Sequence, residues 1–578
     1  MPALGEEVRG EALREVPERS VPHMLALRAA VEPGRVAVRS RNAAGRWVDL
    51  TWAQLEERRR ALAAALIGLG VHPGDRVALV APNSVEMLVA EMAILTAGAV
   101  SAPVFPDYNQ DLLLHCLNDS GARVAFAGSA LQQHRITPSK GIERIVVLDD
   151  QPLEDPRAMP LKALDHARPA ELPARDRGDL AFLLYTSGTT GRPRGVELTH
   201  WNVLSQQAAI GQVWNVSRDD IFLSYLPWHH CFGSLFERMM ALWHRATLVL
   251  DDSRGRDLAK LIANWREVKP TVYFSVPRVF SALRDAALKD PAARAALLHD
   301  RLRFVFSAAA PLPQPLFRFF EDARVPVLEG WGLTETSPCV TVSTPSGARE
   351  AGVVGFPLPG TSVKLEPVSD LPHGEVLVRG EQVMRGYRNL PHDTGRAMRD
   401  GWFHSGDLAS WTASGLRLAG RIDGVFKLQN GEKVSSAEVE ARMVAATPLI
   451  EQALAVGAGQ PFVAALCWIS PAAARRFLEE RQLEAPADLV SSPEVRRAIV
   501  EALQAANLLA RVPYERVRRV ALVGEAPSLE NGQLTPTSKL VRGTITNRQQ
   551  ALIAALADEA PHPAVLEIVR RGDPFGNA

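Results

Sequence analysis

The sequence has no excess of either charge, few cysteines and no long apolar run, and each absence excludes a class of protein. Lys plus Arg and Asp plus Glu both number 65 in 578 residues, so net charge gives no case for nucleic acid or an anionic membrane as a partner. The most apolar long stretch, residues 92–105, is too short to span a bilayer. No basic and apolar leader opens the chain, so we expect a cytoplasmic protein, with peripheral membrane contact left open.

The scarcity of cysteine also limits the chemistry. The four cysteines have no C-x-x-C spacing, which fits a reducing compartment and argues against a disulfide framework or a structural zinc site. They are Cys116, Cys231, Cys339 and Cys467. The adjacent His229, His230 and Cys231 have metal-ligand character, but neighbouring ligands without a partner cluster make a poor zinc site.

Strand and helix patterns alternate through the first part of the chain. Residues 35–39 and 47–50 flank a glycine-containing turn, which predicts a hairpin. Thr51 is a suitable cap for a helix from 52 to about 69. A buried strand at 76–81 and a helix at 84–97 follow, and a further helix is expected over about 234–243. This order predicts an α/β fold with mainly parallel, doubly wound sheets.

A chain of this length is too long for one ordinary hydrophobic core. The pattern of predicted strands, turns and helices also changes twice along it. After residue 352 short strands alternate with turns, which predicts a small β-rich subdomain. The glycine-flanked joint at 420–424 is followed by a compact α+β segment with a helix over 436–446. We therefore predict a large N-terminal domain, a hinge and a small mobile C-terminal domain, over residues 1–419, 420–424 and 425–578.

The densest chemical signal lies at residues 185–200, directly after the apolar strand 180–184. Between Thr186 and Arg192 it contains four hydroxyls, two glycines and a guanidinium, a composition that can form a nest for phosphate oxygens. It is not a Walker A loop, because G-x-x-x-x-G-K-[ST] does not occur in it. A solvated turn is the alternative for an isolated loop of this kind. A helix capped near Thr199 is expected to follow.

The loop is similar to the signature phosphate loop of the adenylate-forming (AMP-dependent synthetase/ligase) superfamily, which includes acyl-CoA synthetases, luciferases and peptide-synthetase adenylation domains. Five further stretches resemble motifs of this superfamily in the same order. They are Leu226–Gly233, Glu329–Thr336, Asp400–Leu408, Gly420–Val434 and Leu534–Arg542. Six ordered motifs are a specific resemblance, and the chain is most like long-chain fatty acyl-CoA synthetases.

The resemblance implies a nucleotide site. Its glycine-rich loop would grip the β- and γ-phosphates of ATP with Thr186, Ser187, Gly188, Thr189, Thr190 and Gly191. In the second motif, Gly330 and Gly332 flank Trp331, whose ring would lie beside adenine and the acyl group. Thr334 would meet phosphate and Glu335 would hold Mg²⁺, which prefers oxygen ligands. Asp407 would accept hydrogen bonds from both ribose hydroxyls, and Arg421 would bind the nucleotide.

The same resemblance assigns catalytic roles. His230 would lie beside the acyl pocket. Lys539 would be the lysine of adenylation, with its charge between the substrate carboxylate and the α-phosphate. Lys427 would serve in the thioester-forming conformation, reached by rotation about Asp423. Lys433 is interpreted as an exposed turn lysine.

The implied reaction is ATP-dependent activation of a carboxylic acid to acyl-AMP, followed by transfer to coenzyme A. The segment Leu534–Lys539 and an extra residue after Lys427 favour a medium- or long-chain fatty acid. Ser405 and the arginines 192 and 194 depart from the usual threonine and lysines. An aryl or other acid, an acyl carrier protein as acceptor, and a silent nucleotide- or acyl-binding sensor remain alternatives. An amino-acid substrate is disfavoured, because Leu226–His230 lacks the aspartate that would hold an α-amino group.

Overall fold

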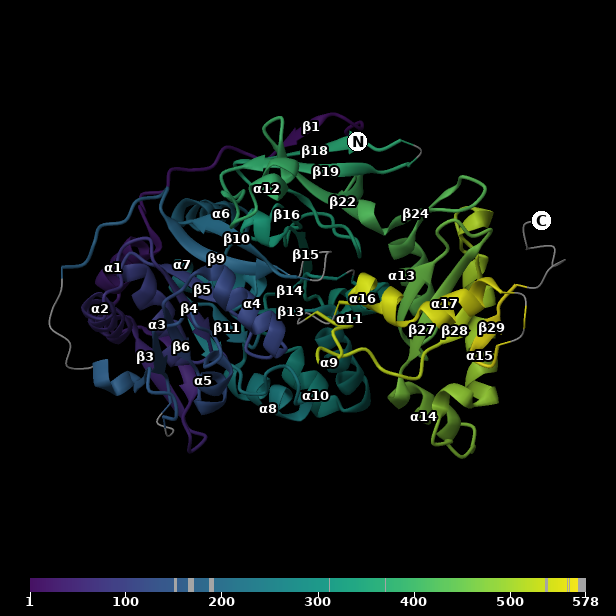
Figure 1. Ribbon diagram of the computed structural model, residues 1–578, viewed down its shortest axis with the longest axis horizontal. Coiled ribbons are helices and arrows are strands. Elements are labelled where there is room, and N and C mark those ends of the chain that lie inside the picture. Colours follow the sequence, from purple (N-terminus) through teal and green to yellow (C-terminus); the bar gives the residue numbers. More distant parts are fainter. Residues whose placement is uncertain are drawn as a thin grey trace.

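The computed structural model describes residues 1–149, 153–164, 171–186, 192–310, 312–369, 371–535, 539–558, 560 and 562–569. A large α/β part occupies the left of Figure 1, a β-rich part its top, and a smaller α+β part its right. Among the described residues, no helix has both the length and the apolar character needed to cross a bilayer.

The first large sheet has nine strands in the order β17-β16-β15-β14-β13-β11-β12-β2-β3. Its centre is parallel from β2 to β15, with antiparallel strands at both edges. The strands are β2 (Val36–Arg41), β3 (Trp47–Thr51), β11 (Ile221–Ser224), β12 (Thr247–Leu250), β13 (Val272–Ser275), β14 (Phe304–Ser307), β15 (Val327–Trp331), β16 (Thr341–Val342) and β17 (Phe356–Pro357). The hairpin expected near residues 35–50 is the antiparallel pair β2 and β3.

The second large sheet has eight strands in the order β20-β10-β9-β5-β4-β6-β7-β8. They are β4 (Arg76–Val80), β5 (Val100–Pro103), β6 (Val124–Ala127), β7 (Arg144–Val147), β8 (Ala158–Pro160), β9 (Leu180–Thr186), β10 (Arg194–Thr199) and β20 (Gly386–Tyr387). The pairs from β9 to β8 are parallel, whereas β10 folds back antiparallel on β9. The prediction of mainly parallel, doubly wound sheets is confirmed, but strand β10 was not predicted.

Helices cover both sheets. They are α1 (Val21–Val31), α2 (Trp52–Gly68), α3 (Val85–Thr96), α4 (Gln110–Ser120), α5 (Ala130–Ile136), α6 (His200–Val213), α7 (Met239–His244), α8 (Leu258–Val268), α9 (Pro277–Lys289), α10 (Pro291–Leu297) and α11 (Gln314–Asp322). The predicted caps are confirmed: Thr51 and Thr199 each accept a hydrogen bond from the third residue of the helix that follows. The helix expected over about 234–243 begins differently, with a π-helical turn at Phe232–Arg238.

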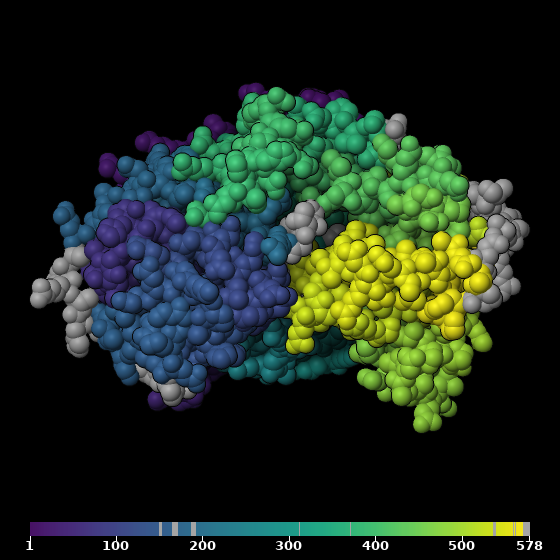
Figure 2. All heavy atoms as spheres, viewed as in Figure 1, coloured from purple at the N-terminus to yellow at the C-terminus, as the bar shows by residue number. Residues whose placement is uncertain are grey.

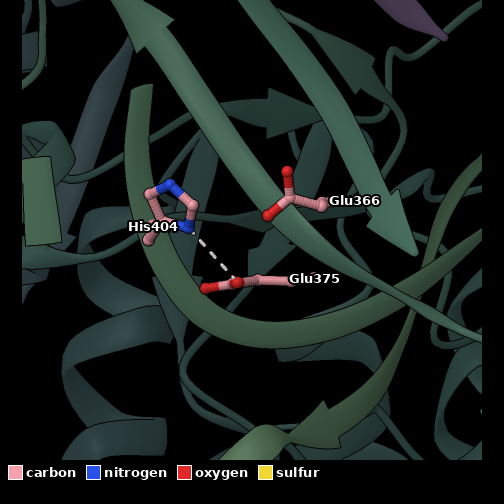
Figure 3. A group of neighbouring side chains, drawn as sticks. All are labelled: Glu366, Glu375 and His404. Atoms are coloured by element: carbon pink, nitrogen blue, oxygen red, sulfur yellow. Dashed lines mark hydrogen bonds and ion pairs between the residues drawn. The ribbon is translucent and has the colours of Figure 1, made fainter. Parts of the chain in front are cut away.

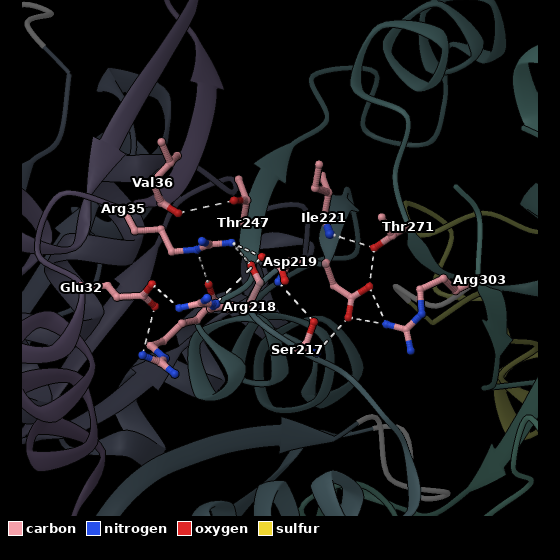
Figure 4. Close-up of polar contacts among 12 residues, drawn as sticks. Glu32, Arg35, Val36, Ser217, Arg218, Asp219, Ile221, Thr247, Thr271 and Arg303 are labelled. Carbon is pink, nitrogen blue, oxygen red and sulfur yellow. Dashed lines mark hydrogen bonds and ion pairs between the residues drawn. The ribbon is translucent and has the colours of Figure 1, made fainter. Parts of the chain in front are cut away.

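Polar contacts fasten the amino-terminal edge of the nine-stranded sheet (Figure 4). Asp220, just before β11, accepts hydrogen bonds from Thr271 Oγ1 at 2.6 Å and Arg303 Nη1 at 2.7 Å, ahead of β13 and β14. On the other side, Glu32 after α1 pairs with Arg218 at 2.8 Å. The opposite, carboxyl-terminal edge of the parallel strands is the edge where such sheets usually bind ligands.

The β-rich subdomain is a six-stranded antiparallel sheet. It contains β1 (Glu7–Arg9), β18 (Thr361–Pro367), β19 (Gly374–Gly380), β21 (Met398–Arg399), β22 (Trp402–Thr412) and β23 (Gly415–Arg421), with α12 (Pro391–Ala397) beside it. The predicted short strands after residue 352 are therefore present. Strand β22 leads to the site described below.

The C-terminal part has its own apolar core, which includes Val434, Val439, Ile499 and Leu503. Its elements are β24 (Val425–Lys427), β25 (Lys433–Ser435), α13 (Ser436–Ala446), β26 (Ile450–Val456), β27 (Val463–Ile469), α14 (Pro471–Glu479), α15 (Pro493–Asn507), β28 (Val517–Leu522), α16 (Arg542–Arg548), α17 (Gln550–Ala557) and β29 (Val565–Glu567). Figure 2 shows its surface, green to yellow, packed against the rest of the molecule. Lys433 is not an exposed turn residue as predicted, because it begins β25 and donates to the carbonyl of Ser369 at 2.7 Å.

Two fully buried charges tie the π-helical turn to helix α3. Arg238 forms an ion pair with Glu91, and both side chains are 0% exposed. Ser101 Oγ donates to Glu91 Oε1 at 2.9 Å, and the Arg238 guanidinium lies 4.9 Å from the centre of the Trp228 ring. Because both groups are buried, removing either one would leave the other charge unpaired in the core and would destabilise the fold.

We therefore expect Glu91→Leu to lower the free energy of unfolding by about 3–5 kcal/mol, since it leaves Arg238 buried without its carboxylate. The double variant Glu91→Leu/Arg238→Met removes both charges and is expected to stay within about 2 kcal/mol of the wild type. Urea unfolding followed by tryptophan fluorescence measures both. A double variant less stable than Glu91→Leu would contradict this account of the pair.

Candidate active site

The last residues of β15 bring an indole to the carboxyl-terminal edge of the nine-stranded sheet. Trp331 is 7% exposed, and its Nε1–H donates a hydrogen bond to Asp407 Oδ2 at 2.8 Å. The turn that follows requires glycine, because a Cβ on Gly332 would lie 1.9 Å from the carbonyl oxygen of Pro338. The sheet edge and strand β22 are thus joined by one hydrogen bond.

Both oxygens of the Asp407 carboxylate are held. Arg421 Nη1 donates to Oδ1 at 3.0 Å, while its Nε donates to Asp423 at 3.0 Å. Burial raises the pKa of Asp407, and the Arg421 charge and the Trp331 N–H oppose that rise. Each carboxylate oxygen keeps a second lone pair, so the group can accept further hydrogen bonds from a ligand.

The bulge of β22 just before Asp407 is supported by Glu375 on the neighbouring strand β19 (Figure 3). Glu375 Oε1 accepts a hydrogen bond from the Gly406 N–H at 3.1 Å, and its Oε2 lies 3.3 Å from His404 Nδ1. Glu366, Glu375 and His404 have the composition of a metal site, but Arg399 Nη2 already lies 2.9 Å from His404 Nδ1. The group therefore supports Gly406, whose φ of +72° favours glycine.

A second group of side chains lies around the motif at 226–233. Thr334 Oγ1 donates to Cys231 Sγ at 3.2 Å, and burial raises the pKa of that thiol to about 12, so it is neutral at physiological pH. His230 Nδ1 accepts from the Phe232 N–H at 3.2 Å, which leaves the proton of the neutral ring on Nε2. Burial, helped by the charge of Lys539, lowers the pKa of His230 to about 4.

Glu335 is buried, 7% exposed, and one of its oxygens is held by a tyrosine. The Tyr387 hydroxyl donates to Glu335 Oε1 at 2.8 Å. Arg194 lies over the Tyr387 ring at 4.4 Å and within 3.5 Å of Asp393. Arg194, one of the two arginines that replace the usual lysines, therefore supports Tyr387. Arg192 is exposed.

The phosphate loop lies largely outside the described residues, which exclude Ser187, Gly188, Thr189, Thr190 and Gly191. The strand expected at 180–184 is present but runs two residues further, so that Thr186 ends β9. The Thr186 hydroxyl oxygen is buried and makes no hydrogen bond within the described part of the chain. A buried hydroxyl of this kind is suited to a ligand oxygen.

Of the two lysines that the sequence singled out, only Lys539 lies at this site. Lys539 follows the described Thr535, whose Oγ1 accepts its N–H at 3.0 Å. Part of Lys539 remains exposed to solvent. Loss of hydration around its ammonium group lowers the pKa of Lys539; the charge of Asp407 opposes this and that of Arg421 adds to it. Lys427 is exposed on β24, and no contact given for the described residues joins it to Asp407 or Trp331.

Comparison with models of protein families shows to which family the chain belongs. The model of the AMP-binding enzyme family matches residues 25–388, and that of the AMP-binding enzyme C-terminal domain matches residues 423–560. The chain belongs to the AMP-binding enzyme family. The resemblance seen in the six motifs is thereby confirmed, and so is the fold of a large α/β domain with a separate small C-terminal domain.

Curated relatives of this AMP-binding enzyme include ligases for different acids. The chain is 31% identical over 571 residues to the long-chain-fatty-acid–CoA ligase FadD15 of Mycobacterium bovis, covering 89% of this chain and 93% of that protein. It is 32% identical over 441 residues to a feruloyl-CoA synthase of an Amycolatopsis species, covering 75% and 84%. These matches make it an adenylate-forming acyl- or aryl-CoA ligase.

A solved structure supports the fold of the AMP-binding enzyme. The anthranilate CoA ligase AuaEII, crystallised with anthranoyl-AMP, superposes with a TM-score of 0.77 at 24% identity, covering 94% of this chain and 99% of that one. At this identity the likeness extends to the fold alone.

Several contacts of the AMP-binding enzyme carried no signal in the sequence. Tyr387 lies 52 positions beyond Glu335, and the Trp331–Asp407 bond spans 76 positions. Motif matching named Trp331 and Asp407 separately but gave no reason to connect them. Each pair joins segments that only the tertiary fold brings together, which a single sequence does not reveal.

We expect Trp331→Phe to raise the KM for ATP about tenfold, because a hydrogen bond to a charged group contributes about 1.5 kcal/mol or more while the ring remains. The matched control is Trp411→Phe. Trp411 is also 7% exposed, and its indole N–H has no hydrogen-bond partner among the described residues. Steady-state kinetics with varied ATP measure both, and equal KM values for the two variants would count against a role of the bond.

Proposed function

We propose that the protein activates a medium- or long-chain fatty acid with ATP to form acyl-AMP and pyrophosphate, then transfers the acyl group to coenzyme A. The observation that carries the proposal is that Lys539, from the C-terminal domain, lies close enough to Asp407 and Arg421 for their charges to act on it. Trp331 and Arg421 both hold the Asp407 carboxylate. The 31% identity to a long-chain ligase over 89% of the chain supports the choice of acid.

In this proposal the protein supplies positions and charges, and no covalent nucleophile. The substrate carboxylate attacks the α-phosphorus of ATP, and pyrophosphate leaves. Asp407 holds the ribose and Trp331 lies beside adenine, so the α-phosphate is fixed in front of Lys539. The lysine charge offsets repulsion between the two anions as the bond forms. Cys231 stays a neutral thiol because burial raises its pKa to about 12.

The donor set suits ATP with Mg²⁺. Glu335 offers a carboxylate whose orientation is fixed by the Tyr387 hydroxyl, and hard cations prefer such oxygens. The hydroxyl of Thr186, which has no hydrogen-bond partner among the described residues, is suited to a phosphate oxygen. When bound, Mg²⁺ would neutralise charge on the β- and γ-phosphates.

The proposal includes a change of conformation between the two half-reactions. Lys539 and Lys427 lie on the same small domain, over residues 425–578, and only Lys539 is at the site in this structure. Asp423 within the joint 420–424 serves as the hinge, and Gly420 has a φ of +118° that favours glycine. Rotation about the joint would bring Lys427 to the site for thioester formation.

The wall behind Gly330 is apolar and aromatic. A Cβ at Gly330 would meet the Phe306 ring at 2.9 Å, and Phe306 packs against Phe232 and Phe236 with ring centres 5.7 and 5.0 Å apart. A hydrophobic acid suits such a wall. An aryl acid is the second candidate, because one relative is a feruloyl-CoA synthase.

The direct test is ATP–pyrophosphate exchange over fatty acids of 8 to 18 carbons (about the medium-to-long range), ferulate and benzoate, repeated as thioester formation with coenzyme A. We expect the highest kcat/KM with a fatty acid and transfer to coenzyme A. Preference for ferulate would move the substrate class to aryl acids. Exchange without thioester would indicate a carrier-protein acceptor, and no exchange with any acid would indicate a binding protein.

We expect Lys539→Ala to abolish adenylate formation while thioester formation from supplied acyl-adenylate continues, because the lysine acts only in the first half-reaction. Separate assays of the two half-reactions measure this. Equal loss in both would contradict the assignment of Lys539.

The pKa of Lys539 gives a prediction for pH. Since the charged form is the active one and loss of hydration lowers its pKa below the usual 10.5, exchange should fall with rising pH at a midpoint below 10.5. Lys539→Arg keeps its charge at these pH values, so the alkaline fall in its residual activity should move to higher pH. An unchanged midpoint in Lys539→Arg would assign the fall to another group.

A further inference from the structure

One of the contacts between the C-terminal and N-terminal domains lies at a turn of the β-rich sheet. The turn joins β18 to β19 and includes Ser369 and His373. Lys433, at the start of β25, donates to the Ser369 carbonyl at 2.7 Å. His373 is 8% exposed, and its Nε2 lies 3.3 Å from Glu438 Oε1 in the first turn of α13. Two residues of the mobile domain therefore hold the same turn.

Three charged or titratable groups form this contact, two from the C-terminal domain and one from the N-terminal domain. Arg511 Nη1 lies 3.4 Å from both His373 Nε2 and Glu438 Oε1. Arg511 and Glu438 both belong to the C-terminal domain, whereas His373 belongs to the other. Rotation of the C-terminal domain would keep the Arg511–Glu438 pair together and would remove His373 from it. The His373 contact is thus specific to the present arrangement of the domains.

The contact also acts on Glu438 chemically. The hydrogen bond from His373 is the largest cause that lowers the pKa of Glu438, ahead of the charges of His373 and Arg511. By contrast, a second ion pair across the domains among the described residues, Arg278–Glu451, is 4.0 Å long and far more exposed. Partly buried, short pairs contribute more than exposed ones.

We propose that His373 and Glu438 form an interdomain latch that favours the conformation in which Lys539 reaches the nucleotide site. Both are positioning residues, since neither touches the reacting groups. The latch rests on the proposed function, because it divides the two half-reactions: it promotes adenylation and must open before thioester formation.

The test compares His373→Gln, Glu438→Gln and the double variant in the two half-reactions. Each single variant should lower the rate of ATP–pyrophosphate exchange about two- to fivefold, the range expected for a partly exposed ion pair. Thioester formation from supplied acyl-adenylate should be unchanged or faster. The double variant should match the single ones, because one contact is lost in all three.

The matched control is Glu567→Gln, which breaks the 2.7 Å Arg519–Glu567 pair within the C-terminal domain. It should leave the ratio of the two rates unchanged. Equal losses of both rates in His373→Gln, or additive losses in the double variant, would overturn the latch.

A second measurement follows the distance between the two domains and does not require the acid substrate to be known. All four native cysteines are buried, so spin labels can be placed on Leu131→Cys and Leu483→Cys, which are 64% and 39% exposed in the two domains. With ATP bound, His373→Gln should shift the distance distribution away from the wild-type maximum. Identical distributions would overturn the latch even if the chain is active. Failure of the proposed function would instead appear as absent exchange with every acid in the unmodified chain.

Discussion

The site depends on the carboxylate of Asp407. Its two oxygens are held by Trp331 from β15 and by Arg421 from the end of β23, and Arg421 is in turn held by Asp423 at the joint. Two segments that are far apart in the sequence, β15 and the hairpin of β22 and β23, thus meet at one buried charge. Because a buried carboxylate needs such partners, the fold cannot move one of them without exposing or unpairing the others.

In our proposal this arrangement links the nucleotide site to the movement of the C-terminal domain. Arg421 and Asp423 lie in or beside the proposed hinge, residues 420–424. Arg421 donates one hydrogen bond to Asp407, the proposed ribose ligand, and another to Asp423, so the carboxylate and the hinge are connected through one side chain. On the far side, Lys539 approaches the same carboxylate from the mobile domain, and the β18–β19 turn holds that domain at Lys433 and Glu438. We therefore propose that this is the conformation used for adenylation.

Much of this could be predicted from the sequence where the signal is local. Caps at Thr51 and Thr199, the hairpin of β2 and β3, and the parallel order of the sheets follow from hydrogen-bonding side chains and apolar periodicity. The family followed from six ordered motifs.

The contacts between distant residues could not be predicted: Tyr387 with Glu335, Trp331 with Asp407, and His373 with Glu438. Each joins residues more than fifty positions apart, so no local preference encodes it. The turn at Phe232–Arg238 was wrongly expected to be regular helix, and there two consecutive charged residues are both buried.

We propose that the enzyme in this conformation completes adenylation without the acceptor thiol. The most direct measurement mixes the enzyme with ATP and its preferred fatty acid in the absence of coenzyme A, quenches the reaction, and quantifies acyl-AMP. The account predicts that acyl-AMP accumulates to about one per active site and is consumed when coenzyme A is added. Absence of acyl-AMP until coenzyme A is present would contradict it.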